Sequence, residues 1–296
     1  MLLKQTVQNF IDDDAIKLSA SLSYYTIFSL APLIVIVISV AGLVFGQDAV
    51  EGRIYNQING LIGADAAMQI QTIIANIQLQ DKGFGGTVIG FGILFFGASG
   101  VFTEIQSSIN YIWGIKAKPK KGILKYIINR LLSFSLVISI GFILMVSLLI
   151  NSIMDILYDK LQHLLNIEKT SVNILYGINI LLIFTVITTL FTVIYKVLPD
   201  AYIRWKDAVL GSCFTAVLFI IGKFLIGLYI GNSKLGVTYG AAASIIIILV
   251  WVYYTSIILY LGAEFTKTYA KTKGGGIKPN AQAVYIIKTE SIEMPA

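Results

Sequence analysis

The residues that could carry chemistry in this chain are three ionisable side chains within long apolar runs: Glu104, Lys223 and Glu264. A charged group in a membrane helix is costly and usually faces protein, water or a substrate. Arg130 begins another apolar run at a similar predicted depth. We expect Glu104, Arg130 and Glu264 to cluster near the cytoplasmic side, and Lys223 to lie nearer the outer side. A gate, a proton-coupled site or a lipid-headgroup site would use such groups; interhelical ion pairing and snorkelling are the structural alternatives.

Polar residues at helical spacing form a second candidate feature. One stripe consists of Thr185, Thr188, Thr189 and Thr192, and another of Ser19, Ser23 and Thr26. Such faces either line a hydrated cavity or hydrogen-bond between packed helices, and packing is the commoner role. The Gly-x3-Gly spacings at Gly86–Gly90 and Gly227–Gly231 also favour close helix contact.

Several reaction classes lack the residues they need. The chain has one histidine, His163, and one cysteine, Cys213, which do not make a standard zinc site. Residues 12–14 are consecutive aspartates, whose side chains fan around a helix and suit a helix N-terminus. No Walker loop, dinucleotide fingerprint or nucleophile elbow occurs. We therefore expect no metal, no cofactor and no enzymatic activity.

The composition places these residues in a membrane protein. Of 296 residues, 56% are apolar and 13% are charged, whereas soluble domains carry about 25% charged residues. The apolar runs are continuous rather than alternating, which favours helices. The run from Tyr239 to Glu264 is the clearest. About 20 apolar residues in a helix cross a hydrocarbon core of about 30 Å, so this run predicts a membrane span.

We predict an all-α fold, a polytopic bundle of six transmembrane helices in residues 1–272. The spans lie at about 24–46, 84–107, 131–153, 174–198, 207–230 and 240–266. Pro32 should kink the first span. Residues 47–83 carry two apolar sets at helical spacing, which predict amphipathic helices in the first extracytoplasmic loop. Residues 273–296 begin with three glycines and predict a flexible cytoplasmic tail.

The loop charges predict an orientation. Lys and Arg residues in alternate loops outnumber those in the other loops by roughly three to one, which places both termini in the cytoplasm. The densest basic cluster spans residues 116–130. Lysines beside a span attract anionic lipid, each by about 1 kcal/mol. We therefore expect membrane lipids, anionic at the cytoplasmic face, as partners, and no nucleic acid. The oligomeric state stays open.

Three motifs resemble the YihY/BrkB family of bacterial inner-membrane proteins, once labelled ribonuclease BN-like. They are SASLSYY and SLAPL at 19–33, YKVLPD followed by a tryptophan at 195–205, and an aromatic-rich last span closed by Gly-Ala-Glu. The resemblance covers about residues 10–270, and Asp200 stands where asparagine is commoner. The matching positions include Tyr24, Pro32, Pro199, Asp200, Trp205, Tyr239, Gly240 and Gly262. The resemblance implies a six-helix fold in the inner membrane and a loose link to envelope lipid export.

Three hypotheses of function follow. The leading one is an inner-membrane protein that handles or transports an amphiphilic envelope component such as a lipid. Glu104, Arg130 and Glu264 would be its polar participants. The alternative is a non-transporting scaffold or assembly factor. The third is a membrane-bound ribonuclease that depends on residues 12–14. Substrate, direction and energy source stay open.

Overall fold

The computed structural model describes residues 2–29, 100–118, 169–232 and 243–286. Side-chain surroundings are described for most of these, with gaps at 169–180 and at several positions near 227–232 and 243–245. Several predictions fall outside the described residues. They are the kink at Pro32, the amphipathic loop 47–83, Gly86–Gly90, Arg130, the span at 131–153, Tyr239, Gly240 and the last ten residues.

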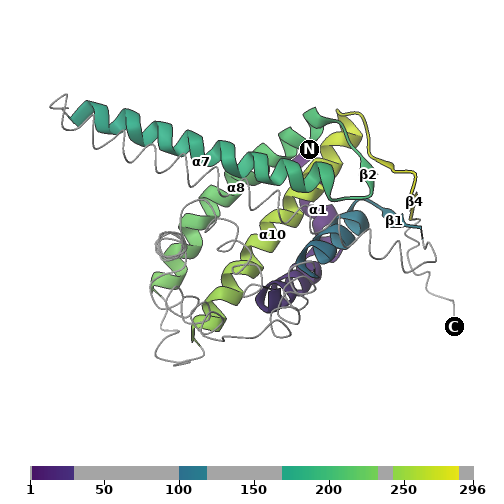
Figure 1. Cartoon of the computed structure of the whole chain (residues 1–296), viewed down its shortest axis with the longest axis horizontal. Coiled ribbons are helices and arrows are strands. Elements are labelled where there is room, and N and C mark those ends of the chain that lie inside the picture. The colour runs from purple at the N-terminus through teal and green to yellow at the C-terminus, as the bar shows by residue number, and fades with distance from the viewer. Residues whose placement is uncertain (1, 30–99, 119–168, 233–242, 287–296) are drawn as a thin grey trace, which may run out of the picture.

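The described chain is mostly helical, with four short strands (Figure 1). Two helical stretches, 15–29 and 100–112, run to the edge of the described residues. The remaining elements are α1 (Leu2–Asp12), β1 (Ile115–Ala117), α7 (Lys169–Val197), β2 (Ala201–Tyr202), α8 (Trp205–Asn232), α10 (Ala243–Thr272), β3 (Lys278–Pro279) and β4 (Ala283–Tyr285).

Helices α7, α8 and α10 coincide with the predicted spans at 174–198, 207–230 and 240–266. Within the described residues, two helices are long and apolar enough to cross a membrane: Trp205–Ile226 and Ile246–Thr272. A shorter apolar helix covers Ile183–Val197. Their outer faces carry exposed apolar side chains, such as Phe224 and Leu225 on α8. Such faces suit a lipid environment, where apolar surface needs no protein cover.

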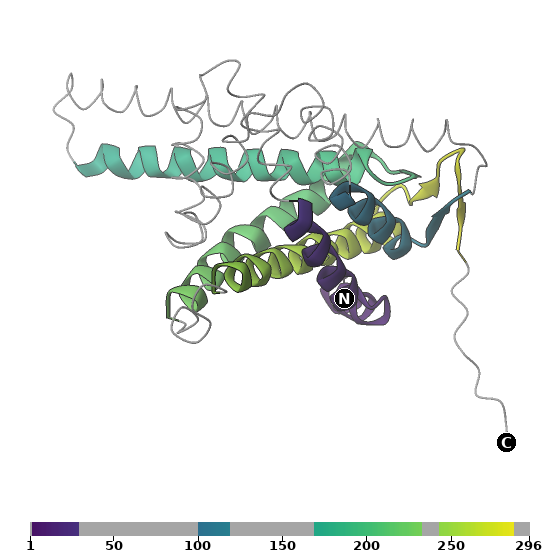
Figure 2. The ribbon, with the colours of Figure 1, turned by 60° about the horizontal axis from the view of Figure 1, so that its bottom comes forward.

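Helix α8 packs between α7 and α10 and runs antiparallel to α10 (Figures 1 and 2). Small residues allow this close approach. A Cβ added to Gly211 would collide with Thr266, and one added to Gly262 would collide with Thr215 and Tyr195. Because lipid tails are as apolar as leucine, such close van der Waals packing holds membrane helices together. Gly262, one of the family-motif positions, therefore serves the packing of these helices.

Tyr195 connects all three long helices. Its side chain is fully buried, and its hydroxyl donates to the Leu259 carbonyl oxygen at 2.7 Å. The same hydroxyl lies 3.1 Å from Thr215 Oγ1. Tyr195 comes from α7, Thr215 from α8 and Leu259 from α10. The first residue of the YKVLPD motif thus marks the point where the bundle is tied together.

The prediction of a purely helical fold missed two small sheets. Strand β1 pairs antiparallel with β4, with Ile115 opposite Tyr285. Strand β2 pairs antiparallel with β3, with Ala201 opposite Pro279. Both sheets use residues after 272, where we expected a flexible tail. The glycines there allow close contact and a sharp turn: Gly276 has a φ of 74°, which favours glycine.

Candidate functional site

The predicted charge at Glu264 belongs to a buried ion triad. The Lys267 ammonium donates to Asp13 Oδ2 at 2.8 Å and to Glu264 Oε2 at 2.9 Å. The three side chains are 10%, 8% and 0% exposed, for Lys267, Asp13 and Glu264. We call Asp13, Glu264 and Lys267 the ion triad. It places two carboxylates and one cation where water has almost no access.

Local structure positions the three groups. Glu264 and Lys267 are three residues apart on α10, which puts them on one helix face. Asp13 lies in the turn between α1 and the helix 15–29, where Asp14 has a φ of 51°. That turn separates the aspartates: Asp13 is buried, while Asp12 and Asp14 are exposed. The three side chains do not converge, but the turn, rather than the predicted placement around one helix, separates them.

The ion triad attaches the N-terminal turn to the last helix. Asn9 Nδ2 adds a bond to Thr268 Oγ1 at 3.3 Å, one residue further along α10. Burying charges costs free energy that their attraction repays only with good geometry, so such a group mainly secures a specific arrangement. With no exposed surface, Glu264 is placed to hold helices rather than to contact a ligand.

Glu104 lies apart from the ion triad. Its carboxylate accepts a hydrogen bond from Ser21 at 2.6 Å and is half-buried. Tyr260 is fully buried nearby on α10, and its hydroxyl has no hydrogen-bond partner among the described residues. The expected cluster joined Glu104 and Glu264 through Arg130. In the described part of the chain, Glu264 pairs with Lys267 and Asp13 instead, and Glu104 with Ser21.

Asp200 organises the polar end of the bundle. Its Oδ2 accepts from Asn110 Nδ2 at 3.0 Å and from Gln106 Nε2 at 3.3 Å. Its backbone N–H donates to Asn110 Oδ1 at 2.8 Å, and Asn280 Nδ2 donates to its Oδ1 at 3.3 Å. Pro199 beside it is buried. The Pro-Asp motif therefore joins the loop after α7 to the helix 100–112 and to the tail.

A second acidic residue anchors the tail to α8. Asp207 pairs with Arg204, with 3.1 Å between Oδ2 and Nε, and accepts the Gly275 N–H at 2.9 Å. The nearby Trp205 is exposed, as expected of an interfacial anchor, and the Lys196 ammonium lies 5.4 Å from its ring centroid. Lys196 also donates to the Ile203 carbonyl oxygen. These contacts hold the basic residues of this loop in place.

The threonine stripe on α7 bonds to its own helix. Thr185, Thr189 and Thr192 each donate to the carbonyl oxygen four residues earlier, at 2.7 to 2.8 Å. Of these, Thr192 is buried and the other two are exposed. Ser19 and Thr26 bond their own helix in the same way. These three threonine hydroxyls are therefore satisfied within their own helix, whereas the buried Thr188 hydroxyl has no hydrogen-bond partner among the described residues.

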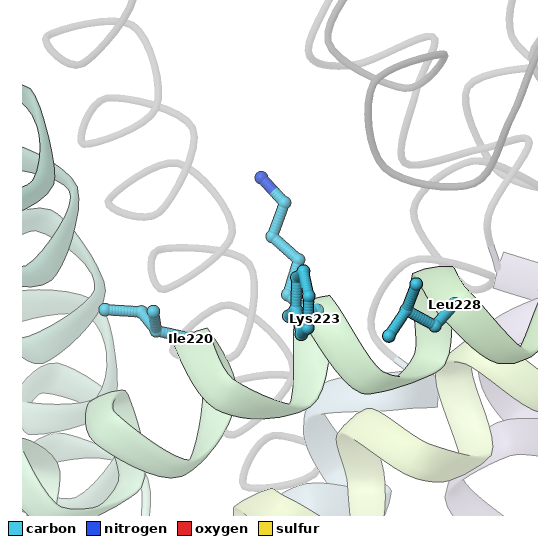
Figure 3. Close-up of a pocket in the computed structure, with 4 residues that line it drawn as sticks. Ile220, Lys223 and Leu228 are labelled. Atoms are coloured by element: carbon cyan, nitrogen blue, oxygen red, sulfur yellow. The ribbon is translucent and has the colours of Figure 1, made fainter. Parts of the chain in front are cut away.

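Lys223 is the predicted ionisable residue that is open to a ligand. It lines a shallow hollow on α8 with Ile220, Phe224 and Leu228 (Figure 3). The Lys223 side chain extends away from the helix between Ile220 and Leu228. Phe224 is 68% exposed and Leu228 is 50% exposed. One ammonium group thus stands in an apolar surface on a helix long enough to span a membrane.

Asp13, Lys267 and Asn110 were missed as polar participants. Lys267 had a local signal, since it lies one helical turn after Glu264. Asp13 had none, because it is separated from Lys267 by 254 residues. Among the described residues, no group of three or more His, Cys, Asp or Glu side chains could hold a metal ion. Tyr24, a further motif residue, is exposed and packs its ring against Phe28.

Long apolar helices that pack through small residues, with most of their charges near one end, define an integral membrane protein. The model of the family described as virulence factor BrkB matches residues 6–285, and the chain belongs to that family. The resemblance drawn from the three motifs is thereby confirmed. No solved structure matches the chain.

The curated relatives carry the name UPF0761 membrane protein. One from Saccharophagus degradans is 27% identical over 89% of this chain and 58% of its own length. One from a Psychrobacter species is 27% identical over 90% of this chain and 48% of its own length. One from Pseudomonas aeruginosa is 26% identical over 86% of this chain and 59% of its own length. The chain therefore spans about half to three fifths of these relatives.

Proposed function

We propose that this protein handles or transports an anionic amphiphile, such as a phospholipid, in the bacterial inner membrane. The observation that carries the proposal is the Lys223 hollow. Its ammonium matches an anionic headgroup, and the apolar side chains of Ile220, Phe224 and Leu228 match acyl chains. The proposal includes six membrane helices, cytoplasmic termini, no enzymatic activity and no nucleic-acid partner.

The depth of Lys223 supports this proposal. Gly211 lies opposite Thr266, near the level where the charges of α10 begin. Lys223 is twelve residues further along α8, or roughly 18 Å at 1.5 Å per residue. A hydrocarbon core is about 30 Å thick. The lysine therefore lies within the core thickness, where an unpaired cation is costly and an anionic headgroup would lower that cost.

Glu104 is the second polar participant in this proposal. Among the described residues, its carboxylate accepts a hydrogen bond from Ser21 and has no cation within 4 Å. We assign Glu104 to the path and Glu264 to the framework, because Glu104 keeps partial exposure and Glu264 has none.

The test is a lipid-flipping assay with the full chain in proteoliposomes. Fluorescent phosphatidylglycerol and phosphatidylcholine are reduced by dithionite from one side, and insertion is verified by protease accessibility. We expect flux above empty vesicles. A lysine near an anionic headgroup contributes about 1 kcal/mol, so Lys223→Gln should lower phosphatidylglycerol flux about fivefold. Lys278→Gln, at an exposed strand position outside the basic cluster 116–130, is the matched control. Flux equal to that of empty vesicles sinks the proposal.

The scaffold alternative also has an observation in its favour. The glycine–threonine contacts of α8 with α10, together with the ion triad, tie three elements closely. A scaffold requires no lipid movement. It predicts that Lys223→Gln and Glu104→Gln leave cellular function intact while changes at exposed surfaces abolish it. Cellular complementation with the two variants separates the hypotheses.

A further inference from the structure

Helix α1 carries an apolar stripe that no described residue covers. Leu3, Val7 and Ile11 are 57%, 50% and 58% exposed. They are spaced four residues apart, so they lie along one face of the helix. The opposite face carries Gln5 and Asp12, both exposed. Three half-exposed branched side chains in line on a polar helix indicate a surface that meets something apolar.

The stripe continues the face by which α1 already packs. Thr6 and Phe10 are 1% and 7% exposed and lie on the neighbouring part of the helix surface. That part faces α10, since Asn9 and Asp13 bond to it. The apolar arc of α1 is therefore wider than its contact with α10. The part of the apolar arc that carries Leu3, Val7 and Ile11 lies outside the contact with α10.

Helix α1 packs against the end of α10 that carries its charged residues. Asn9 of α1 bonds to Thr268, and Asp13, in the turn that follows α1, bonds to Lys267.

Helix α1 docks at the level where the apolar part of α10 ends. The α10 sequence carries no charge from Ala243 until Glu264, and Lys267 and Lys271 follow within two turns. About 20 residues fill the hydrocarbon core, so the core ends near Glu264. Helix α1 docks at Lys267 and Thr268. It therefore lies at the level of the lipid headgroups.

We infer that α1 is an interfacial helix, with Leu3, Val7 and Ile11 inserted into the lipid surface and the ion triad attaching it to the last span. Exposed Lys4 borders the stripe, and exposed Asp12 lies on the far face. These charges are balanced, so apolar burial rather than headgroup charge drives the insertion. Insertion should then occur with both neutral and anionic lipid. This inference is independent of the Lys223 proposal.

The test places one environment-sensitive fluorophore on either face of α1. In a Cys213→Ser background, Val7→Cys and the matched control Gln5→Cys are labelled with nitrobenzoxadiazole. The full chain is reconstituted in phosphatidylcholine vesicles with and without phosphatidylglycerol. We expect blue-shifted emission and quenching by lipids spin-labelled near the headgroup at position 7. We expect quenching by aqueous iodide at position 5.

Two results would overturn the inference. Equal iodide quenching at both positions would mean that the stripe faces water. Protection of position 7 from both iodide and spin-labelled lipid would mean that protein covers it, either a second copy or another segment. Labels at Ile11→Cys repeat the measurement one turn further along the same stripe. The signal at position 7 should not depend on phosphatidylglycerol; a signal that requires it would contradict apolar burial as the driving force.

Discussion

Replacing Lys267 by methionine tests the role of the ion triad most directly. Methionine keeps much of the side-chain length and removes the ammonium that lies 2.8 Å from Asp13 Oδ2 and 2.9 Å from Glu264 Oε2. The two carboxylates, 8% and 0% exposed, then lose the cation that balances them. The free energy of unfolding should fall because water cannot replace the lost partner.

The expected loss follows from the burial of the partners. Removing one member of a buried ion pair costs about 3–5 kcal/mol. We take the lower end of this range as the expected loss. A loss of about 3 kcal/mol raises the unfolding equilibrium constant about 150-fold. For a chain of this size it lowers the melting temperature by about 6 °C or more.

Thermal unfolding of the full chain in detergent, followed by tryptophan fluorescence, measures this effect. Lys223→Met is the matched control, since it removes an exposed lysine and should shift the melting temperature little. A triple variant with Asp13→Asn, Glu264→Gln and Lys267→Met should recover most of the loss, because it leaves no charge buried. An effect of Lys267→Met no larger than that of Lys223→Met would refute the reasoning. A triple variant as unstable as Lys267→Met would refute charge imbalance as the cause.

Two further predictions concern helix packing and the tail. Gly262→Ala should destabilise the chain by about 1–3 kcal/mol, because the added methyl group collides with neighbours across two helix contacts. The control is Gly100→Ala, whose added Cβ would lie 3.6 Å from its nearest neighbour. Equal melting temperatures for the two variants would contradict the packing argument. Asp207→Asn should raise the rate of trypsin cleavage after residue 273, because the bond to the Gly275 N–H weakens. The exposed Asp12→Asn is the control and should leave the cleavage rate unchanged. An unchanged rate for Asp207→Asn would mean that only the strands hold the tail.

The three long helices could be predicted from the sequence because their cause is local. Apolar length alone locates α7, α8 and α10 to within a few residues of the predicted spans at 174–198, 207–230 and 240–266. The apolar run also locates one charged residue, because Glu264 lies where the apolar run of α10 ends. Burial in lipid constrains each helix separately, so no knowledge of its neighbours is needed.

The partners of these helices could not be predicted in the same way. We grouped Glu264 with Glu104 and Arg130 by their depth, yet depth does not say which helices are neighbours. The cation that reaches Glu264 is Lys267, one turn away, and the other carboxylate comes from the far end of the chain. The tail strands were missed for a related reason: strands of two or three residues carry no periodic pattern, and only their pairing defines them.

The two strand pairings make β1 and β2 depend on residues that are synthesised much later, at 278–285. Ile115 pairs with Tyr285, a separation of 170 residues. At about 5–20 residues synthesised per second, β1 waits roughly 10–35 s for its partner after it leaves the ribosome. During that interval its edge is open to pairing with other chains. Arrival of β4 gives β1 its partner, and arrival of β3 gives β2 its partner, so a ribosome that stalls within α10 would release a chain in which both strands lack the partners they have in the structure.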